Sequence, residues 1–232
     1  MGDQFARLRL AALNIDGVLL NDTFSPVIHH FVVSRGASYT ADTERAIFSQ
    51  PRAVAARRLA EAVGGSLTAD QVLTAYFAER DDYLAQHPVA VDEGVPALLH
   101  RLRALGLGLV CYGGLPEHHF ETHLGAWADL FDGPGYVCTD AFRPGLHEIT
   151  TEIFGLKHDQ AVFVDDVARV GEEARMLGMP FIGRPSRYEH GFQRESMRQA
   201  GVRHIVDGLD AIDGDLLRTV DAEAAAGRVW EA

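Results

Sequence analysis

The sequence is poor in cysteine, has no long apolar run and carries no excess of positive charge. Its two cysteines, Cys111 and Cys138, each stand in an apolar stretch typical of a buried strand, so we expect reduced thiols in a cytoplasmic protein. No run reaches the roughly 18 consecutive apolar residues that predict a membrane span. The N-terminal stretch, MGDQFARLRL, lacks the apolar segment of a signal peptide.

The formal net charge is −12 and the sequence pI is near 5.3. An acidic surface disfavours nonspecific binding to nucleic acid or to anionic membranes, so we expect neither as a partner. The 47% hydrophobic and 23% charged residues indicate a globular chain with a substantial core. A length of 232 residues fits one domain with an insertion, or two small domains.

The stretch RLRLAALNIDGVLLN, residues 7–21, gives the first indication of a functional site. Its apolar run from Leu8 to Leu13 is followed by Asn14 and Asp16, and then by Gly17. This pattern predicts a buried parallel strand that leads into a loop. Ligands of open α/β sheets bind at the carboxyl ends of such strands, so Asn14 and Asp16 are candidate site residues. The alternative is a strand with a polar turn and no chemistry.

Residues 21–90 have helical patterns and contain no convincing core strand. From Val91 onward, helices alternate with short apolar strands, which predicts βαβ units and a parallel sheet. We therefore predict an α/β fold with a Rossmann-like parallel sheet, helices on both faces and an inserted all-helical segment. The predicted strands after the first are residues 107–112, 136–139, 161–164, 180–183 and 204–206.

A second informative stretch, AVFVDDVARVGEEARMLGMPFIG, covers residues 161–183. Its apolar strand ends in two adjacent carboxylates, Asp165 and Asp166, and a helix follows. Two acids at one strand end repel each other, and a hard cation such as Mg²⁺ relieves that repulsion. The alternative is that the two side chains cap the following helix.

Both stretches resemble motifs of the haloacid dehalogenase-like (HAD) superfamily. The first resembles the motif of an apolar strand followed by Asp, any residue, Asp, Gly and Val or Thr, and the second resembles the fourth motif, including the downstream EARMLGMP. The resemblance implies a Rossmann-like core and a mobile helical cap of the C1 type. It assigns residues 1–20 and 91–232 to the core and residues 21–90 to the cap.

The resemblance also implies roles for single residues. The family's nucleophilic Asp is replaced here by Asn14, whereas Asp16 stands at the acid/base position and would ligate Mg²⁺ through its backbone carbonyl. Asp165 would be the metal ligand and Asp166 its neighbour. A carboxamide is a negligible nucleophile and carries no charge, so an aspartyl intermediate cannot form at Asn14 and Mg²⁺ is expected to bind weakly.

The two middle motifs depart from the family pattern as well. Cys111, followed by Tyr112 and Gly113, stands where the family has a Ser or Thr that binds the phosphoryl group, and Arg143 stands in place of its Lys. A thiol is a poorer donor than a hydroxyl, whereas Arg can hold a phosphate or a carboxylate. We predict that these four residues and the N–H groups of the loop at Gly17 bind a small anion. The alternatives are a small buried side chain at Cys111 and a solvated charge at Arg143.

These departures favour a homologue that has lost hydrolysis and serves as a small-anion-binding, regulatory or scaffold protein, with a protein partner left open. The alternative is an active Mg²⁺-dependent phosphatase or dehalogenase with a different nucleophile, for example Asp16 or a water held by Asp165. A third hypothesis is an enzyme that recruits Cys111 or histidines for different chemistry.

Two further groups are weaker candidates. His119 and His123 have i,i+4 spacing on a predicted helix, but the sequence offers no third metal ligand, so we interpret them as ordinary histidines. Arg52, Arg57 and Arg58 form a basic cluster in the predicted cap, which either faces the site or is a solvated helix face.

Overall fold

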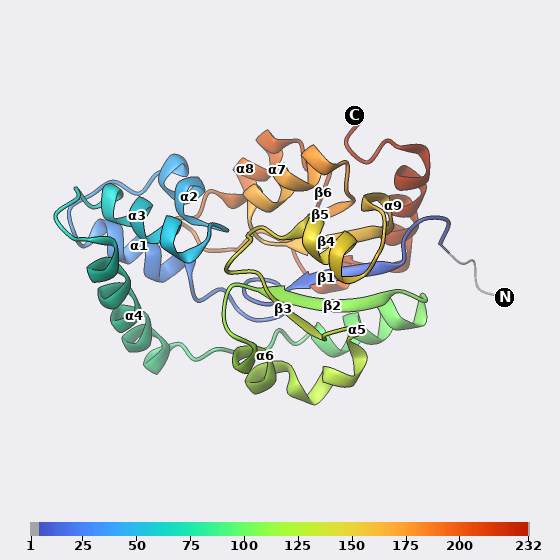
Figure 1. Cartoon of the computed structure of the whole chain (residues 1–232), viewed down its shortest axis with the longest axis horizontal. Helices are drawn as coiled ribbons and strands as arrows, with labels where there is room; N and C mark the ends of the chain where they lie inside the picture. The colour runs from blue at the N-terminus through green and yellow to red at the C-terminus, as the bar shows by residue number, and fades with distance from the viewer. Residues whose placement is uncertain (1–4, 232) are drawn as a thin grey trace.

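The computed structural model describes residues 5–231, so the first four residues of the predicted core and residue 232 lie outside the described part. Within residues 5–231, six parallel strands form one sheet in the order β3-β2-β1-β4-β5-β6 (Figure 1). The strands are β1 (Leu10–Asn14), β2 (Gly108–Gly113), β3 (Tyr136–Cys138), β4 (Ala161–Asp165), β5 (Phe181–Gly183) and β6 (His204–Ile205). The predicted α/β fold with a parallel sheet is therefore confirmed.

The helices fall into those of the inserted segment and those of the sheet layers. The inserted segment contains α1 (Ser25–Val33), α2 (Ala41–Ile47), α3 (Arg52–Ala62) and α4 (Ala69–Gln86). The sheet layers contain α5 (Val95–Ala104), α6 (Glu117–Leu124), α7 (Ala168–Leu177), α8 (Gln193–Ala200) and α9 (Gly214–Ala226). Four shorter helical turns are η1 (Gly125–Leu130), the π-helical η2 (Glu148–Ile153), η3 (His158–Gln160) and η4 (Leu209–Ala211).

The sheet is buried on both faces, which explains why its strands are continuous apolar runs. Along β1, Ala11 and Leu13 pack into one hydrophobic cluster with α5, α6 and α9, whereas Leu10 and Ala12 pack into another with α7 and α8. Successive side chains of a strand point to opposite faces, so this alternation sets which strand residues share a face. The exception to predicted burial is Cys138, which is exposed at the end of β3, while Cys111 is buried as predicted.

The order of the strands reverses at β1. The chain runs outward from β1 through β2 to β3, and then returns to β4 on the other side of β1. The carboxyl ends of β1 and β4 therefore flank the point at which ligands bind in doubly wound folds. Asn14 ends β1 and Asp165 ends β4, so the fold brings the two motifs of the sequence together.

Helices α1–α4 form a separate helical group beside the sheet, which we call the cap (Figure 1). Two segments that are hydrogen-bonded to each other connect it to the sheet, with Asn21 N donating to Ala90 O and Asp92 N to Leu19 O. The cap helices begin at Ser25 and end at Gln86, inside the predicted range 21–90. The division of the chain into two domains stays a prediction.

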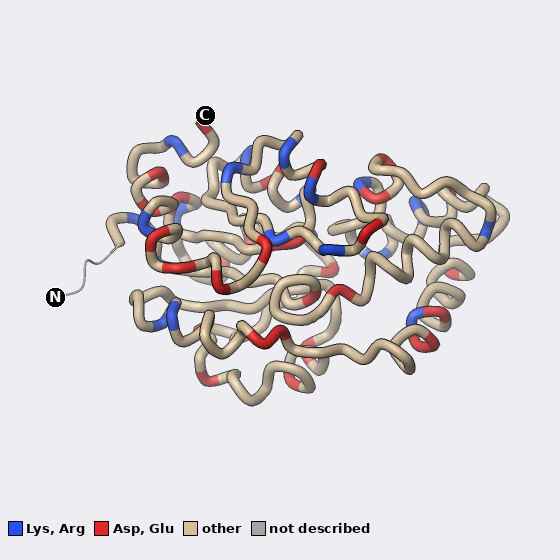
Figure 2. Tube along the Cα trace, turned by 180° about the vertical axis from the view of Figure 1, so that it is seen from behind, with Lys and Arg blue, Asp and Glu red and all other residues tan. Residues whose placement is uncertain are grey.

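Charged residues of both signs are spread over the chain trace (Figure 2), and between Arg103 and Arg143 the charged residues are all acidic. Among residues 5–231, no helix is both long and apolar enough to cross a membrane.

Candidate active site

Asn14, the residue at the nucleophile position, is 4% exposed and points to the end of β4. Its Nδ2 donates to Asp166 Oδ1 at 3.0 Å and to the backbone oxygen of Asp16 at 3.1 Å. The backbone oxygen of Asp16 can only accept, which fixes the orientation of the amide. The amide nitrogen of Asn14 therefore lies between the two oxygens that the resemblance assigns to a cation.

This arrangement does not fit Mg²⁺. A hard cation needs several oxygen ligands, with carboxylate charge among them. Here Asn14 Nδ2 donates hydrogen bonds to the Asp16 carbonyl and to one Asp166 oxygen, so these two oxygens already have a partner in place of a cation. Within residues 5–231, no group of three or more His, Cys, Asp or Glu side chains is arranged to hold a metal.

Asp166 is the carboxyl group that faces Asn14, and Gly17 makes room for it. A methyl group at Gly17 would lie 2.1 Å from Asp166 Oδ2, and Gly17 has a φ of +86°. Glycine tolerates both this close approach and the positive φ because it has no Cβ. Burial, followed by repulsion from Asp165, raises the pKa of Asp166 well above its usual value. A protonated Asp166 lowers the electrostatic cost of this buried acidic pair.

Asp165, the predicted metal ligand, is turned away from the cleft. Its Oδ2 accepts a hydrogen bond of 2.5 Å from the Tyr112 hydroxyl, and its Oδ1 accepts one of 2.8 Å from Val167 N. Asp165 is 0% exposed and does not line the cleft, because both oxygens are turned into the core. Burial raises the pKa of Asp165 to about 6, while the hydrogen bond from Tyr112 opposes this increase.

The predicted ligand-binding residues Cys111, Tyr112 and Gly113 do not line the cleft. Tyr112 pairs in register with Asn14, so Cys111 points to the opposite face of the sheet and packs in the core. Burial raises the pKa of the Cys111 thiol, which argues against a nucleophilic role. The backbone oxygen of Gly113 accepts from Thr139.

Arg143, the residue at the family's Lys position, lines the cleft. A methyl group at Gly114 would lie 2.2 Å from its Nη1, so the guanidinium packs directly against the backbone after β2. Among the described residues it makes no ion pair, and its buried Nε has no hydrogen-bond partner. The only lysine of the chain, Lys157, is exposed before β4, at the opposite edge of the sheet, and does not replace it.

The loop after Asn14 does not provide the donor that we predicted at Gly17. Its N–H donates to Leu20 O at 3.1 Å, which closes the turn, so this group is not available to an anion.

A contact between Asp16 and His119 was missed in the sequence. His119 Nε2 lies 2.9 Å from Asp16 Oδ1, and the two side chains are only 12% and 13% exposed. His119 belongs to the first turn of α6, which follows β2, so the helix brings the ring to the carboxyl end of the sheet. The sequence signal was a histidine just beyond a strand end and its Gly-Gly turn.

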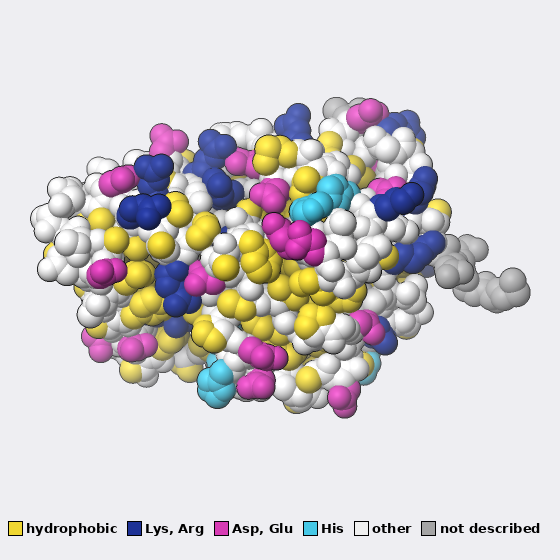
Figure 3. Space-filling view, in the orientation of Figure 1, with side chains coloured by type: hydrophobic (Ala, Val, Ile, Leu, Met, Phe, Trp, Pro, Cys, Tyr) yellow, Lys and Arg dark blue, Asp and Glu magenta, His cyan; other side chains and the backbone are white. Residues whose placement is uncertain are grey.

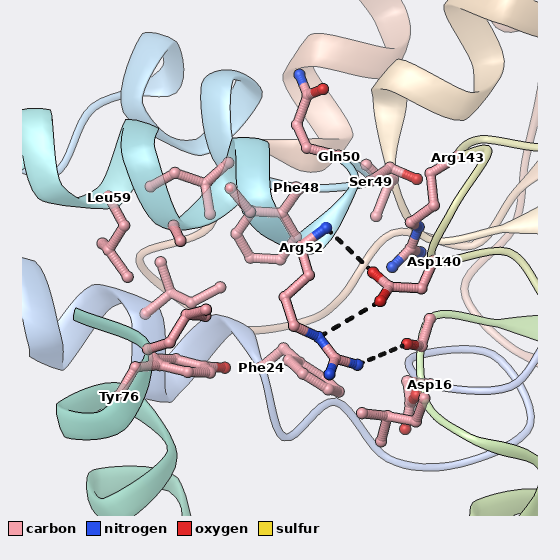
Figure 4. Close-up of a pocket in the computed structure, with 18 of the residues that line it drawn as sticks. Asp16, Phe24, Phe48, Ser49, Gln50, Arg52, Leu59, Tyr76, Asp140 and Arg143 are labelled. Carbon is pink, nitrogen blue, oxygen red and sulfur yellow. Dashed lines mark hydrogen bonds and ion pairs between the residues drawn. The ribbon is translucent and has the colours of Figure 1, made fainter. Parts of the chain in front are cut away.

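Arg52 is the one member of the basic cluster that lies at the cleft. Its backbone N donates to Asp140 Oδ1 at 3.0 Å, and its Nη2 donates to Gly114 O at 3.3 Å (Figure 4). The Nε of Arg52 also lies 3.6 Å from Asp140 Oδ2. Arg57 is exposed and Arg58 pairs with Glu61 of the same helix, so of these three arginines only Arg52 is seen to bond to the core in the described part of the chain.

These side chains line a cavity of about 150 Å³ between the cap and the carboxyl ends of the strands. On the core side its walls are polar, and on the cap side they are mainly apolar (Figure 4). Hydrophobic side chains also reach the surface where the cap meets the core, with basic and acidic side chains around them (Figure 3). The core side is formed by Asn14, Asp16, Gly114, Leu115, Asp140, Arg143, Asp166 and Val167.

A doubly wound parallel sheet, a helical cap inserted after β1 and paired motifs at the ends of β1 and β4 define the HAD-like fold. Solved structures support this assignment. A phosphonoacetaldehyde hydrolase-like protein from Oleispira antarctica superposes with a TM-score of 0.69 at 14% identity, covering 97% of this chain and 96% of that one. β-Phosphoglucomutase from Clostridium difficile gives 0.66 at 13% identity, with 94% and 99% covered.

A haloacid dehalogenase-like protein of unknown function from Agrobacterium tumefaciens has a TM-score of 0.60 and 20% identity, with 94% and 99% covered. No family model matches the sequence, and no curated protein matches it. The resemblance drawn from the motifs is therefore confirmed for the fold, and the structural neighbours are HAD-like phosphatases, mutases and hydrolases.

Proposed function

We propose that this protein binds a small anion in the cleft and has lost aspartyl-nucleophile hydrolysis, so that it acts as a regulatory or scaffold protein. The observation that carries the proposal is the amide of Asn14, hydrogen-bonded to Asp166 and to the Asp16 carbonyl. The amide supplies no nucleophile and satisfies the oxygens that would otherwise hold Mg²⁺. Anion binding is therefore independent of metal and relies on Arg143.

The unpaired guanidinium supports this proposal. Arg143 makes no ion pair within residues 5–231, and its Nε is buried without a partner. An unsatisfied buried donor costs about 1–3 kcal/mol, and an anion that accepts from it offsets this cost. A phosphate or a carboxylate matches the planar fork of the guanidinium.

Thermal shift and calorimetry with phosphate, sulfate and acetate test the anion site, each with and without Mg²⁺. We expect stabilisation that is the same with and without the metal and is lost in Arg143→Gln. Arg57→Gln is a matched control, because Arg57 is an exposed arginine outside the cleft. Equal stabilisation of Arg143→Gln and wild type would place the anion elsewhere.

A phosphatase and dehalogenase screen tests the loss of hydrolysis. We expect no turnover above background in the wild type, because Asn14 forms no covalent intermediate. Metal-dependent turnover that disappears in Asp16→Asn would contradict the proposal.

A second candidate is a hydrolase in which Asp16 takes a different role, and the contact of His119 with Asp16 favours it. In this case Asp16, oriented by the imidazole, acts as the nucleophile or accepts a proton from water in the cleft. Hydrolysis that is lost in both Asp16→Asn and His119→Gln, with Asn14→Ala still active, would support this candidate over the first. The water held by Asp165 is no longer an option, because Asp165 does not line the cleft.

A further inference from the structure

The cap side of the cleft is mainly apolar, and we call it the chamber. The proposed anion site at Arg143 does not explain what would bind there. The chamber is formed by Ile28 of α1, Phe48 before α3, Leu59 of α3, and Leu73, Tyr76 and Phe77 of α4. These side chains are buried or half-buried and face the same cavity as Arg143. A small inorganic anion at Arg143 would leave this chamber without a partner.

Besides Arg143 Nε and Asp22 Oδ2, two hydroxyl groups of residues that line the same cavity lack hydrogen-bond partners in the described part of the chain. The Tyr76 hydroxyl and the Ser49 hydroxyl are buried without a hydrogen bond in the described part of the chain, and their residues are 7% and 6% exposed. Figure 4 shows the Tyr76 hydroxyl directed toward the interior of the pocket. Burial, the largest cause, raises the pKa of Tyr76, so this hydroxyl keeps its proton and can donate to a ligand.

The charges of the core side select the head group of that ligand. Arg143 and Arg52 are the cationic side chains that line the cleft, and Arg52 is already paired with Asp140. One free guanidinium neutralises one negative charge. The acidic side chains of Asp16 and Asp22 also line the cavity, so a dianion would meet repulsion that no metal offsets.

We propose that the ligand is a small carboxylate that carries one benzene-sized apolar group with a hydrogen-bond acceptor at its far end. The carboxylate binds Arg143, the apolar group fills the chamber, and the acceptor receives the hydrogen bond from Tyr76. The whole cleft, including the space beside Arg143, has a volume of about 150 Å³, which is comparable to an apolar cavity that holds benzene, so the ligand carries no apolar group larger than a benzene ring. This inference rests on the proposed anion site and adds the class of its ligand.

Calorimetric titration of the full chain with acetate, phenylacetate, 4-hydroxyphenylacetate, phenyl phosphate and inorganic phosphate tests the inference. We expect phenylacetate to bind at least about tenfold tighter than acetate, because the ring leaves water. Phenyl phosphate is expected to bind more weakly than phenylacetate. In Ala55→Leu, which adds bulk at a residue lining the chamber, the advantage of phenylacetate over acetate should disappear.

Tyr76→Phe tests the hydroxyl without changing the shape of the chamber. The wild type is expected to bind 4-hydroxyphenylacetate more tightly than phenylacetate, because the Tyr76 hydroxyl donates to the phenolic oxygen. Tyr76→Phe is expected to lose this preference and to keep its affinity for phenylacetate. Tyr83→Phe on the same helix is the matched control, because Tyr83 does not line the cavity. If Ala55→Leu does not fold, the Tyr76→Phe comparison still decides.

The outcomes separate this inference from the proposed function. Equal affinities for acetate and phenylacetate would overturn the apolar group and leave the anion site standing. Tighter binding of phenyl phosphate than of phenylacetate would overturn the carboxylate head. If none of the five compounds binds, the anion site itself is wrong. An undiminished advantage of phenylacetate in Ala55→Leu would place the ring outside the chamber.

Discussion

At the scale of single residues, the amide of Asn14 organises the site. Its nitrogen donates to Asp166 and to the Asp16 carbonyl, and in the proposed function this nitrogen stands where a nucleophile and a cation would otherwise lie. Burial and the nearby Asp165 raise the pKa of Asp166, the acid that faces Asn14, and so favour its protonated form. Two predictions follow from these two residues.

Asn14→Asp is expected to bind Mg²⁺ at least roughly tenfold tighter than the wild type, because it replaces a donor with a charged oxygen facing Asp166. Turnover is expected to stay low, since a missing electrostatic contact commonly costs about 10²–10³ in rate and Arg143 replaces the family's Lys. Adding Cys111→Thr is expected to give no gain, because Cys111 points away from the cleft.

Calorimetric Mg²⁺ titration and a phosphatase assay check this prediction. Asn21→Asp, which introduces the same charge at an exposed position, is the control. An ordinary phosphatase rate in Asn14→Asp alone would show that the wild-type cleft is an enzyme site that lacks one residue.

Asp166→Asn is expected to become more stable relative to the wild type as the pH rises from 5 to 8. A carboxyl group whose pKa is raised by folding contributes stability below its unfolded pKa, and that stability is lost as the pH rises through the folded pKa. The difference grows by about 1.4 kcal/mol per pH unit while Asp166 is protonated in the folded state and ionised in the unfolded state. Urea denaturation at pH 5, 6.5 and 8 measures it, and a constant difference would contradict the raised pKa.

At the scale of elements, the strands were predictable because buried parallel strands are apolar runs, and each predicted strand overlaps an observed one. The direction in which the side chains at the strand ends point could not be predicted from the sequence. Asp165 and Asp166 are neighbours in sequence, and only the turn into α7 decides that Asp166 reaches the cleft. The contact of His119 with Asp16 depends on where α6 crosses the sheet, which no local pattern contains.

Helix α3 illustrates how a cap element is held to the core. Arg52, at its first position, joins Asp140 and Gly114 O, and the side chains of the Arg52–Asp140 pair are 40% and 33% exposed. A pair this exposed contributes only about 0.2–1 kcal/mol to the free energy of unfolding. Its larger effect is to fix the position of α3 above the cleft.

Arg52→Ala is therefore expected to change the global stability by less than about 1 kcal/mol and to speed amide hydrogen exchange in the first turns of α3. Mass spectrometry of exchange in α3 measures this, with urea denaturation for the stability. Arg58→Ala is the control, because Arg58 pairs only with Glu61 within α3. The same exchange in both variants would show that Arg52 does not hold the helix.

At the scale of the whole molecule, the cap and the core are joined by buried contacts as well as by two chain segments. Glu44 of α2 is 1% exposed and accepts hydrogen bonds from Phe192 N at 3.0 and 3.1 Å, and from the Tyr39 hydroxyl at 2.8 Å. Phe192 belongs to the core, immediately before α8. Since this bond crosses from the cap to the core, we expect the two parts of the wild type to unfold together.

Glu44→Ala is expected to make the cap and the core unfold in two separate transitions. It leaves Phe192 N–H and the Tyr39 hydroxyl without their acceptor, which costs about 1–3 kcal/mol at a buried position.

Both tryptophans, Trp127 and Trp230, lie outside the cap, so tryptophan fluorescence reports on the core, whereas circular dichroism at the helical band includes α1–α4. The dichroism midpoint should fall below the fluorescence midpoint in Glu44→Ala and coincide with it in the wild type. Glu61→Ala, an exposed cap residue paired only with Arg58, should leave the two coincident. Coincident midpoints in Glu44→Ala would mean that other contacts suffice to couple cap and core.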